Sequence, residues 1–123
     1  MGGYNDQQRY VDVAGAEGAV LEELVALALY YPSGYPPFGL HGVCVEAGVC
    51  HVFRDGVGEF LFAPLTDDDD AMSVYQIMAR PLDEPGSAGR VAALRDYVRA
   101  VRGPRVDREQ MSHGVAGADQ AGR

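Results

Sequence analysis

The stretch from 42 to 63 constrains the fold most, because two turn-forming sequences interrupt its alternating apolar residues. The runs 43–45, 49–53 and 58–62 are rich in valine and phenylalanine, and 46–48 and Asp55-Gly56 separate them. β-Branched and aromatic residues that alternate with a period of two are typical of strands, and Asp-Gly is a strong hairpin signal. The pattern predicts a three-stranded antiparallel meander.

The lengths of the two turns set the predicted register. A two-residue turn at 47–48 would need a positive φ at Ala47, which a Cβ disfavours, so a three-residue loop at 46–48 is predicted. Cys44 then lies opposite Cys50, and a two-residue turn at Asp55-Gly56 sets His51 opposite Phe60. The face predicted to enter the core carries Val43, Val45, Val49, His51, Phe53, Phe60 and Phe62. The other face carries Cys44, Cys50, Val52, Glu59 and Leu61.

Three further segments carry helical patterns. The segment 14–31 is rich in Ala, Leu and Glu, and its wide apolar stripe predicts a helix that is buried on much of its circumference. Thr66 is a good N-cap for a helix over 67–79, with a strand over 72–79 as the alternative. The segment 87–102 has a clean helical stripe that ends at Gly103-Pro104.

These elements predict an α+β fold with an N-terminal helix, a three-stranded antiparallel meander and two C-terminal helices packed on one face of the sheet. In a chain of 123 residues, a single domain over 13–103 is expected. Residues 1–12 are expected to form a polar N-terminal arm and 104–123 a polar C-terminal tail, because both are poor in large apolar side chains.

The charge balance narrows the classes of partner. Eighteen acidic residues against ten basic ones give a net charge of −8, which argues against contact with nucleic-acid phosphates or anionic lipid. We therefore expect another protein, or a second copy of this chain, as the partner, and no nucleic acid or membrane. The sequence carries no cofactor fingerprint, so no cofactor is predicted.

The expected location is the cytoplasm or an assembled particle. The N-terminus lacks the basic and apolar regions of a secretory signal, and the apolar run 24–31 is too short to cross a bilayer. In a reducing compartment, two cysteines are expected to be thiols more often than a disulfide. Every basic residue is Arg, and Ala, Gly and Val are abundant, which suggests a GC-rich bacterial or phage genome.

Two segments are candidates for partner binding. A Pro/Gly-rich stretch contains Tyr30, Tyr31, Tyr35 and Phe38, which suit either an exposed recognition surface or rings that close over the core. The second segment is the run Asp67, Asp68, Asp69 and Asp70. These residues suit a capped helix start, and they are also a candidate contact patch for a basic surface or a site for a hard cation.

The residues Cys44, Cys50 and His51, with His41 nearby, are ligand types found in zinc sites. The Cys-x₅-Cys spacing differs from that of a zinc knuckle, and the predicted register sets His51 on the opposite face from both cysteines. No metal site is therefore predicted. Cys44 and Cys50 suit a disulfide or a pair of thiols. His51 is predicted to be a core histidine, with a general base as the alternative.

The sequence shows no nucleophile elbow, phosphate-binding loop or dense polar constellation, so the chain is predicted not to be an enzyme. The predicted function is a non-enzymatic protein-interaction module, as an accessory, assembly or virion-type structural subunit of a larger complex. One alternative is an acidic inhibitor or immunity-type protein that uses Asp67–Asp70 to block a basic, nucleic-acid-binding site. Another is a small metalloprotein or enzyme centred on His51.

Overall fold

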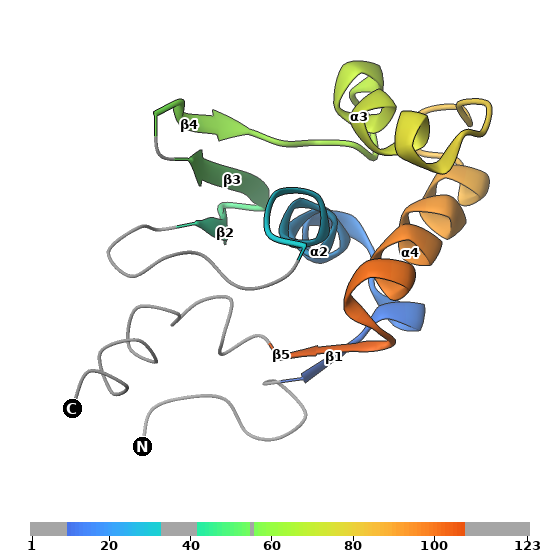
Figure 1. The fold of residues 1–123 in the computed structure, drawn as a ribbon, viewed down its shortest axis with the longest axis horizontal. Coiled ribbons are helices and arrows are strands. Elements are labelled where there is room, and N and C mark those ends of the chain that lie inside the picture. Colours follow the sequence, from blue (N-terminus) through green and yellow to red (C-terminus); the bar gives the residue numbers. More distant parts are fainter. Residues whose placement is uncertain (1–9, 33–41, 55, 108–123) are drawn as a thin grey trace.

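The computed structural model describes residues 10–32, 42–54 and 56–107, which form an α+β fold (Figure 1). The helical elements are the 3-10 turn η1 (Val13–Gly15), α2 (Gly18–Tyr30), α3 (Asp68–Met78) and α4 (Ala88–Arg102). The strands are β1 (Tyr10–Asp12), β2 (Val43–Glu46), β3 (Val49–Arg54), β4 (Gly58–Leu61) and β5 (Arg105–Asp107). The predicted three helices and three-stranded antiparallel sheet are confirmed, and the segment after Thr66 is a helix.

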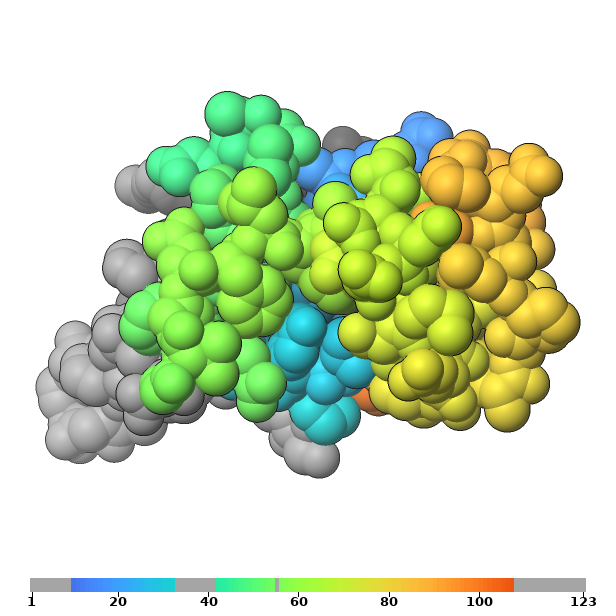
Figure 2. All heavy atoms as spheres, turned by 90° about the horizontal axis from the view of Figure 1, so that it is seen from above, coloured from blue at the N-terminus to red at the C-terminus, as the bar shows by residue number. Residues whose placement is uncertain are grey.

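Helix α2 lies between the β2–β3–β4 sheet and α4 (Figure 1). Residues 21–28 are all buried, which suits a helix that is apolar around its circumference and packs on two neighbours at once. The predicted burial of this helix is confirmed. Seen from above, β4 and α3 lie on either side of the C-terminal part of α2 (Figure 2). Within the described residues, no helix is long and apolar enough to span a membrane.

The two C-terminal helices occupy a different place from the predicted one. Both were expected on the sheet, whereas α4 packs against α2 and α3 packs against α4. The inner face of the sheet is covered by α2, whose Tyr30 ring lies edge-on at 5.6 Å from the rings of both Phe60 and Phe62. Because α2 has two apolar sides to bury, it separates the sheet from the other helices.

A two-stranded ribbon joins the two ends of the described chain. Strand β1 pairs antiparallel with β5, with Tyr10 opposite Asp107 and Val11 opposite Val106. The Val13 amide continues this pairing by donating to the Pro104 carbonyl at 2.9 Å. Regular structure therefore extends beyond the range 13–103 at both ends.

The turn between β2 and β3 differs from the predicted one. Cys44 lies opposite His51 and Val45 opposite Cys50, so the turn contains only Ala47 and Gly48. Their φ angles are 55° and 76°, and two positive φ angles are typical of a type I′ turn, whose twist matches that of the strands. The prediction of a three-residue loop is wrong, because the hairpin tolerates the left-handed Ala47 despite its Cβ.

The turn between β3 and β4 is also different in length. Arg54 lies opposite Gly58, so three residues form the turn where two were predicted. Gly56 and Gly58 have φ angles of 84° and 100°, which side chains with a Cβ rarely adopt. The β2–β3 turn is one residue shorter than predicted, and the β3–β4 turn is one residue longer. The two differences cancel at β4, whose side chains lie on the predicted faces. They turn every side chain of β3 to the other face of the sheet.

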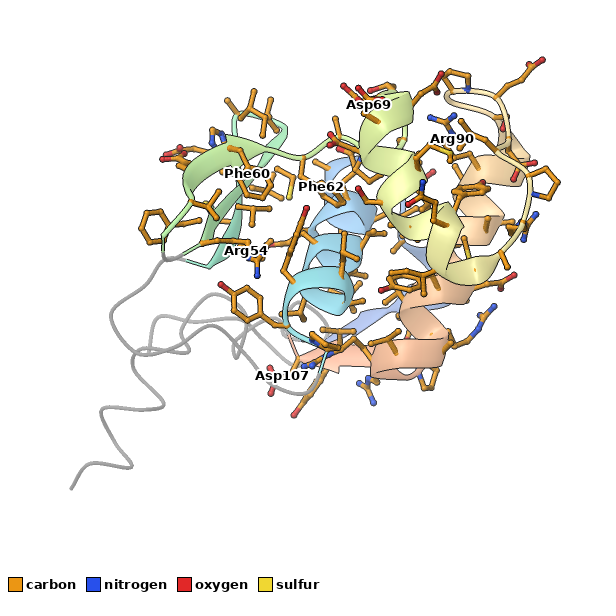
Figure 3. The ribbon with its side chains drawn as sticks, turned by 45° about the horizontal axis from the view of Figure 1, so that its top comes forward. Arg54, Phe60, Phe62, Asp69, Arg90 and Asp107 are labelled. Atoms are coloured by element: carbon orange, nitrogen blue, oxygen red, sulfur yellow. The ribbon has the colours of Figure 1, made fainter. Side chains whose placement is uncertain are left out.

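The inner face of the sheet carries Val43, Cys50, Val52, Phe60 and Phe62. Figure 3 shows Phe60 and Phe62 pointing from the sheet toward α2. Val49, His51 and Phe53, which were predicted for the core, lie on the outer face. The observed register buries apolar side chains from β3 and leaves the polar imidazole near water, which lowers the cost of desolvation.

Candidate functional site

The outer face of the β2–β3–β4 sheet holds a pocket of about 210 Å³. Its described lining residues come from all three strands: Gly42, Cys44 and Glu46 at β2, His51 and Phe53 in β3, and Glu59 in β4. This volume is below that of sites for drug-sized ligands and suits a single side chain or a similarly small group. The pocket exists because β3 turns His51 and Phe53 outward.

His51 is hydrogen-bonded in this pocket, with its Nδ1 at 2.8 Å from Glu59 Oε2. Because an ionised carboxylate only accepts hydrogen bonds, Nδ1 is the donor to Glu59. In the neutral form of the ring, Nε2 is then an acceptor. The His51 side chain is 23% exposed, so the prediction of a core histidine is wrong. Cys44 lies opposite His51 on β2, so a thiol, an imidazole and a carboxylate are neighbours on one face.

The charges around Cys44 oppose a role as a nucleophile. Burial raises the pKa of the Cys44 thiol above its ordinary value, and the negative charges of Glu46, Glu23 and Glu59 raise it further. A nucleophilic cysteine needs the opposite shift, which usually comes from a neighbouring cation or a helix N-terminus. Cys44 is therefore a neutral thiol at neutral pH and forms a weakly polar wall of the pocket.

The two cysteines are free thiols, Cys44 exposed and Cys50 buried. They were predicted to lie opposite each other, but Cys50 lies opposite Val45, and the two side chains leave adjacent strands on opposite faces. Side chains that point apart cannot be bridged without movement of the backbone. Burial raises the pKa of Cys50 well above its ordinary value, and Glu23 and Glu22 add to this effect.

Two exposed apolar side chains share the outer face with the pocket. Leu61 lies opposite His51 and is 59% exposed, and Val49 lies opposite Glu46 and is 36% exposed. We call this surface the outer-face patch, which consists of Cys44, Glu46, Val49, His51, Phe53, Glu59 and Leu61. It combines apolar side chains with carboxylates and an aromatic ring, as the core and rim of protein interfaces do.

The aromatic segment is used partly for packing. Tyr30 packs on Phe60 and Phe62, and the Arg54 guanidinium lies 4.9 Å from the centre of the Tyr30 ring. The Tyr31 hydroxyl donates a hydrogen bond of 3.2 Å to the Phe53 carbonyl. For these two tyrosines the contacts favour rings that close over the core. Tyr35 and Phe38 lie outside the described residues, as does His41.

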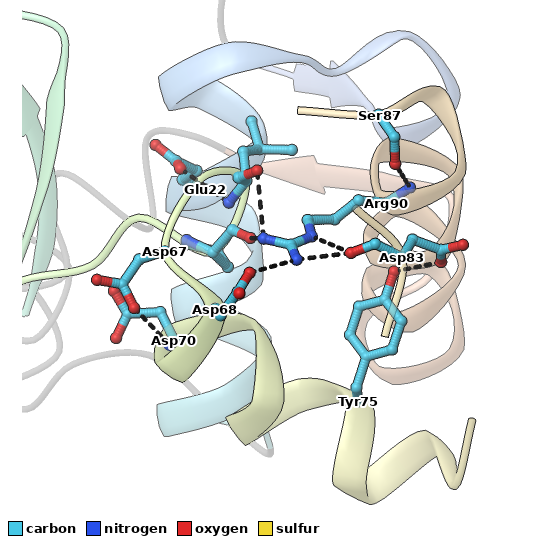
Figure 4. Close-up of polar contacts among 10 residues, drawn as sticks. Glu22, Asp67, Asp68, Asp70, Tyr75, Asp83, Ser87 and Arg90 are labelled. Carbon is cyan, nitrogen blue, oxygen red and sulfur yellow. Dashed lines mark hydrogen bonds and ion pairs between the residues drawn. The ribbon is translucent and has the colours of Figure 1, made fainter. Parts of the chain in front are cut away.

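Three of the four consecutive aspartates, which lie at the start of α3 (Figure 4), accept hydrogen bonds or form an ion pair within the chain. Asp67 accepts a hydrogen bond from the Asp70 amide at 3.1 Å and is the N-cap in place of the predicted Thr66. Asp70 accepts from the Ala63 amide at 2.8 Å, and Asp68 Oδ1 lies 2.7 Å from Arg90 Nη2. Asp69 lies on the outer side of the helix (Figure 3). These contacts agree with a role at the start of the helix.

Arg90 is a structural centre that sequence reasoning missed. Arg90 belongs to α4, and its side chain is fully buried. It donates hydrogen bonds to the carbonyls of Asp83 and Pro64 and to the carboxylate of Asp68 (Figure 4). It lies four residues before Leu94 and seven before Tyr97, both of which are buried. Its position on this apolar stripe is the signal that an arginine faces the interior.

Among the described residues, no group of three or more His, Cys, Asp or Glu side chains is placed to hold a metal ion. Comparison of the chain with protein-family models, curated proteins and solved structures finds no match. The outer-face patch and its pocket are therefore the basis for a functional proposal.

Proposed function

We propose that this chain is a non-enzymatic interaction module that docks its outer-face patch on a basic surface of another protein, as an accessory or assembly subunit of a larger complex. The observation that carries this proposal is the exposure of Leu61 and Val49 beside a pocket with two glutamates. The inner face of the same sheet is covered by α2. An apolar centre with a charged rim is typical of a specific protein interface.

The charge of the patch favours a different protein over a second copy. Glu46 and Glu59 lie on the patch, and the whole chain carries a net charge of −8. Two copies docked face to face would bring these carboxylates together, whereas a basic surface would complement them and speed encounter. The raised pKa of Cys44 adds support for binding over catalysis, because it keeps the thiol neutral.

The alternative that uses Asp67–Asp70 as the contact patch has less support. Asp67, Asp68 and Asp70 already accept hydrogen bonds or an ion pair from their own chain. A partner that bound these carboxylates would compete with contacts that hold the start of α3.

The proposal is tested by a matched pair of substitutions, Leu61→Ser and Ile77→Ser. Ile77 lies on α3 and is 60% exposed, against 59% for Leu61, so both variants remove similar exposed apolar surface. Tagged chains are expressed at equal levels in cells of the source organism, and cross-linked partners are quantified by mass spectrometry. We expect Leu61→Ser to lower recovery of a specific partner at least about tenfold and Ile77→Ser to leave it unchanged.

Two results would overturn this function. One is equal recovery of every partner by the wild type and by both variants. The other is a chain that sediments as a monomer and yields no cross-linked partner at all. A specific partner should also dissociate more readily as salt rises, because the attraction between surface charges is screened.

A further inference from the structure

We propose that the outer-face pocket is a binding site for the guanidinium group of an arginine side chain that the partner supplies. This inference rests on the proposed function, and it names the chemical group that the patch recognises. Three features of the pocket support it: the hydrogen-bonding capacity of its lining, its charge and its aromatic residue.

The polar groups of the pocket are mostly hydrogen-bond acceptors. Glu46 and Glu59 contribute carboxylates, which only accept when they are ionised. His51 Nδ1 donates a hydrogen bond to the Glu59 carboxylate, and in the neutral form of the ring Nε2 is then a further acceptor. The Gly42 carbonyl already accepts from the Phe53 amide at 2.7 Å, which leaves that amide unable to serve a ligand. A ligand rich in donors and without acceptors complements this lining.

An arginine side chain meets this requirement better than a lysine does. A guanidinium has five N–H donors in a plane and no acceptor, and it can bind two carboxylates at once. It is also more weakly hydrated than an ammonium group, and it stacks well on aromatic rings such as that of Phe53. The carboxylates are on β2 and β4, on either side of the β3 residues that form the pocket wall.

The chain itself shows how its architecture accommodates guanidinium groups. The Arg54 guanidinium lies 4.9 Å from the centre of the Tyr30 ring, and the Arg105 guanidinium lies 4.6 Å from that of Tyr10. Buried Arg90 is held by acceptors, namely the carbonyls of Asp83, Pro64 and Leu65 and the carboxylate of Asp68. The pocket is lined by the same kinds of group, an aromatic residue at Phe53 and acceptors at Glu46 and Glu59.

The test is a titration of the full chain, labelled with ¹⁵N, with N-acetyl-arginine amide followed by NMR. N-acetyl-citrulline amide is the control probe, because it has nearly the same shape and no charge. We expect saturable shifts at the amides of Cys44, His51 and Phe53 with the arginine probe, and binding at least about tenfold weaker with the citrulline probe. Equal binding of the two probes, or arginine shifts that map elsewhere, would overturn the inference.

Two variants distinguish the pocket from general attraction to an acidic protein. Glu46→Gln removes one pocket charge and leaves the His51–Glu59 hydrogen bond in place. Glu84→Gln removes an exposed charge outside the pocket and the patch. Arginine binding should weaken several-fold in the first variant and stay unchanged in the second. An equal effect of both variants would show non-specific attraction and overturn the site.

The two proposals fail separately. If Leu61→Ser abolishes partner recovery and Glu46→Gln changes neither partner nor probe binding, docking through the patch stands and the arginine pocket is wrong. If Leu61→Ser leaves partner recovery unchanged, the proposed function is wrong, whatever the arginine probe does.

Discussion

His51 Nδ1 and Glu59 Oε2 lie 2.8 Å apart, which joins β3 to β4 on the outer face of the sheet. This contact depends on the three-residue turn between Arg54 and Gly58. With this turn one residue shorter and the β2–β3 turn unchanged, Phe60 would lie opposite His51 on the outer face, and Glu59 would turn to the inner face. The lengths of the two turns together therefore determine whether the imidazole and the carboxylate line the same pocket.

Replacing Ala47 with Asn should stabilise the fold. Ala47 has a φ of 55°, and Asn-Gly is the sequence that type I′ turns prefer. We expect a gain of about 0.5–1 kcal/mol in the free energy of unfolding, measured by urea denaturation. The control Ala100→Gly, on the exposed face of α4, should lose about 1 kcal/mol. A destabilised Ala47→Asn variant would show that the turn is not the two-residue one.

Replacing Arg90 with Met should strongly destabilise the fold. The substitution leaves the buried Pro64 carbonyl and the half-buried Asp83 carbonyl without this donor, and it removes the ion pair with Asp68. We expect a loss of about 3–5 kcal/mol in the free energy of unfolding, measured by chemical denaturation. Arg99→Ala breaks the exposed pair with Asp96 and should cost less than about 1 kcal/mol. Similar losses in both variants would contradict the role given to Arg90.

Replacing Glu22 with Gln should stabilise the fold at neutral pH but not at acidic pH. Burial raises the pKa of Glu22 above 4.5, and Asp70 raises it further, against the lowering effect of the hydrogen bond from the Leu65 amide. The folded chain thus binds this proton more tightly than the unfolded chain, so the stability contributed by protonated Glu22 is lost as pH rises through its folded pKa. A neutral glutamine avoids that loss.

The measurement for Glu22→Gln is the difference in Tm between variant and wild type at a series of pH values. The difference should be positive at about pH 7.5 and should vanish near pH 3.5, where the wild-type carboxyl is protonated as well. Glu17→Gln, at an exposed position before α2, is the control that removes a carboxylate outside the core. A constant difference across this range would mean that the Glu22 carboxylate is not destabilised by burial.

The two cysteines should differ in reactivity toward a thiol reagent. Cys44 is exposed and Cys50 is buried, so one thiol should react in the native protein and two in the denatured protein. The rate at which Cys44 reacts in the native protein should increase at pH values above 9.0, because the pKa of Cys44 is raised from that value. Cys44→Ser should remove the native reaction. A thiol count in denaturant that increases only after reduction would reveal a disulfide and contradict this structure.

The elements that follow from local pattern could be predicted from the sequence. Helix α2 was recognisable because its apolar stripe is wide, and α4 because Ser87 and Gly103 mark its ends. The lengths of the β2–β3 and β3–β4 turns could not be predicted from local pattern in the same way. A positive φ at Ala47 costs local strain, and the register that it permits buries Cys50 and Val52. These two residues are buried under α2, which is distant from them in sequence, so the local pattern does not show which effect is larger.

The candidate site could not be predicted for the same reason. Cys44, His51 and Glu59 were each recognisable as polar or reactive residues, but the face on which His51 lies depends on both turns. Arg90 was missed because an arginine on a helix is usually exposed, and only the carbonyls of distant segments make its burial favourable.

The pairing of β1 with β5 has a mechanical consequence. Tyr10 and Asp107 are partners at the same end of an antiparallel ribbon. A pulling force applied across these two residues would open the ribbon one pair at a time, a geometry that yields at low load. The ribbon would therefore give way before tension reached the interface between α2 and the sheet. Strain transmitted through the chain ends would be absorbed there and would leave the outer-face patch undistorted.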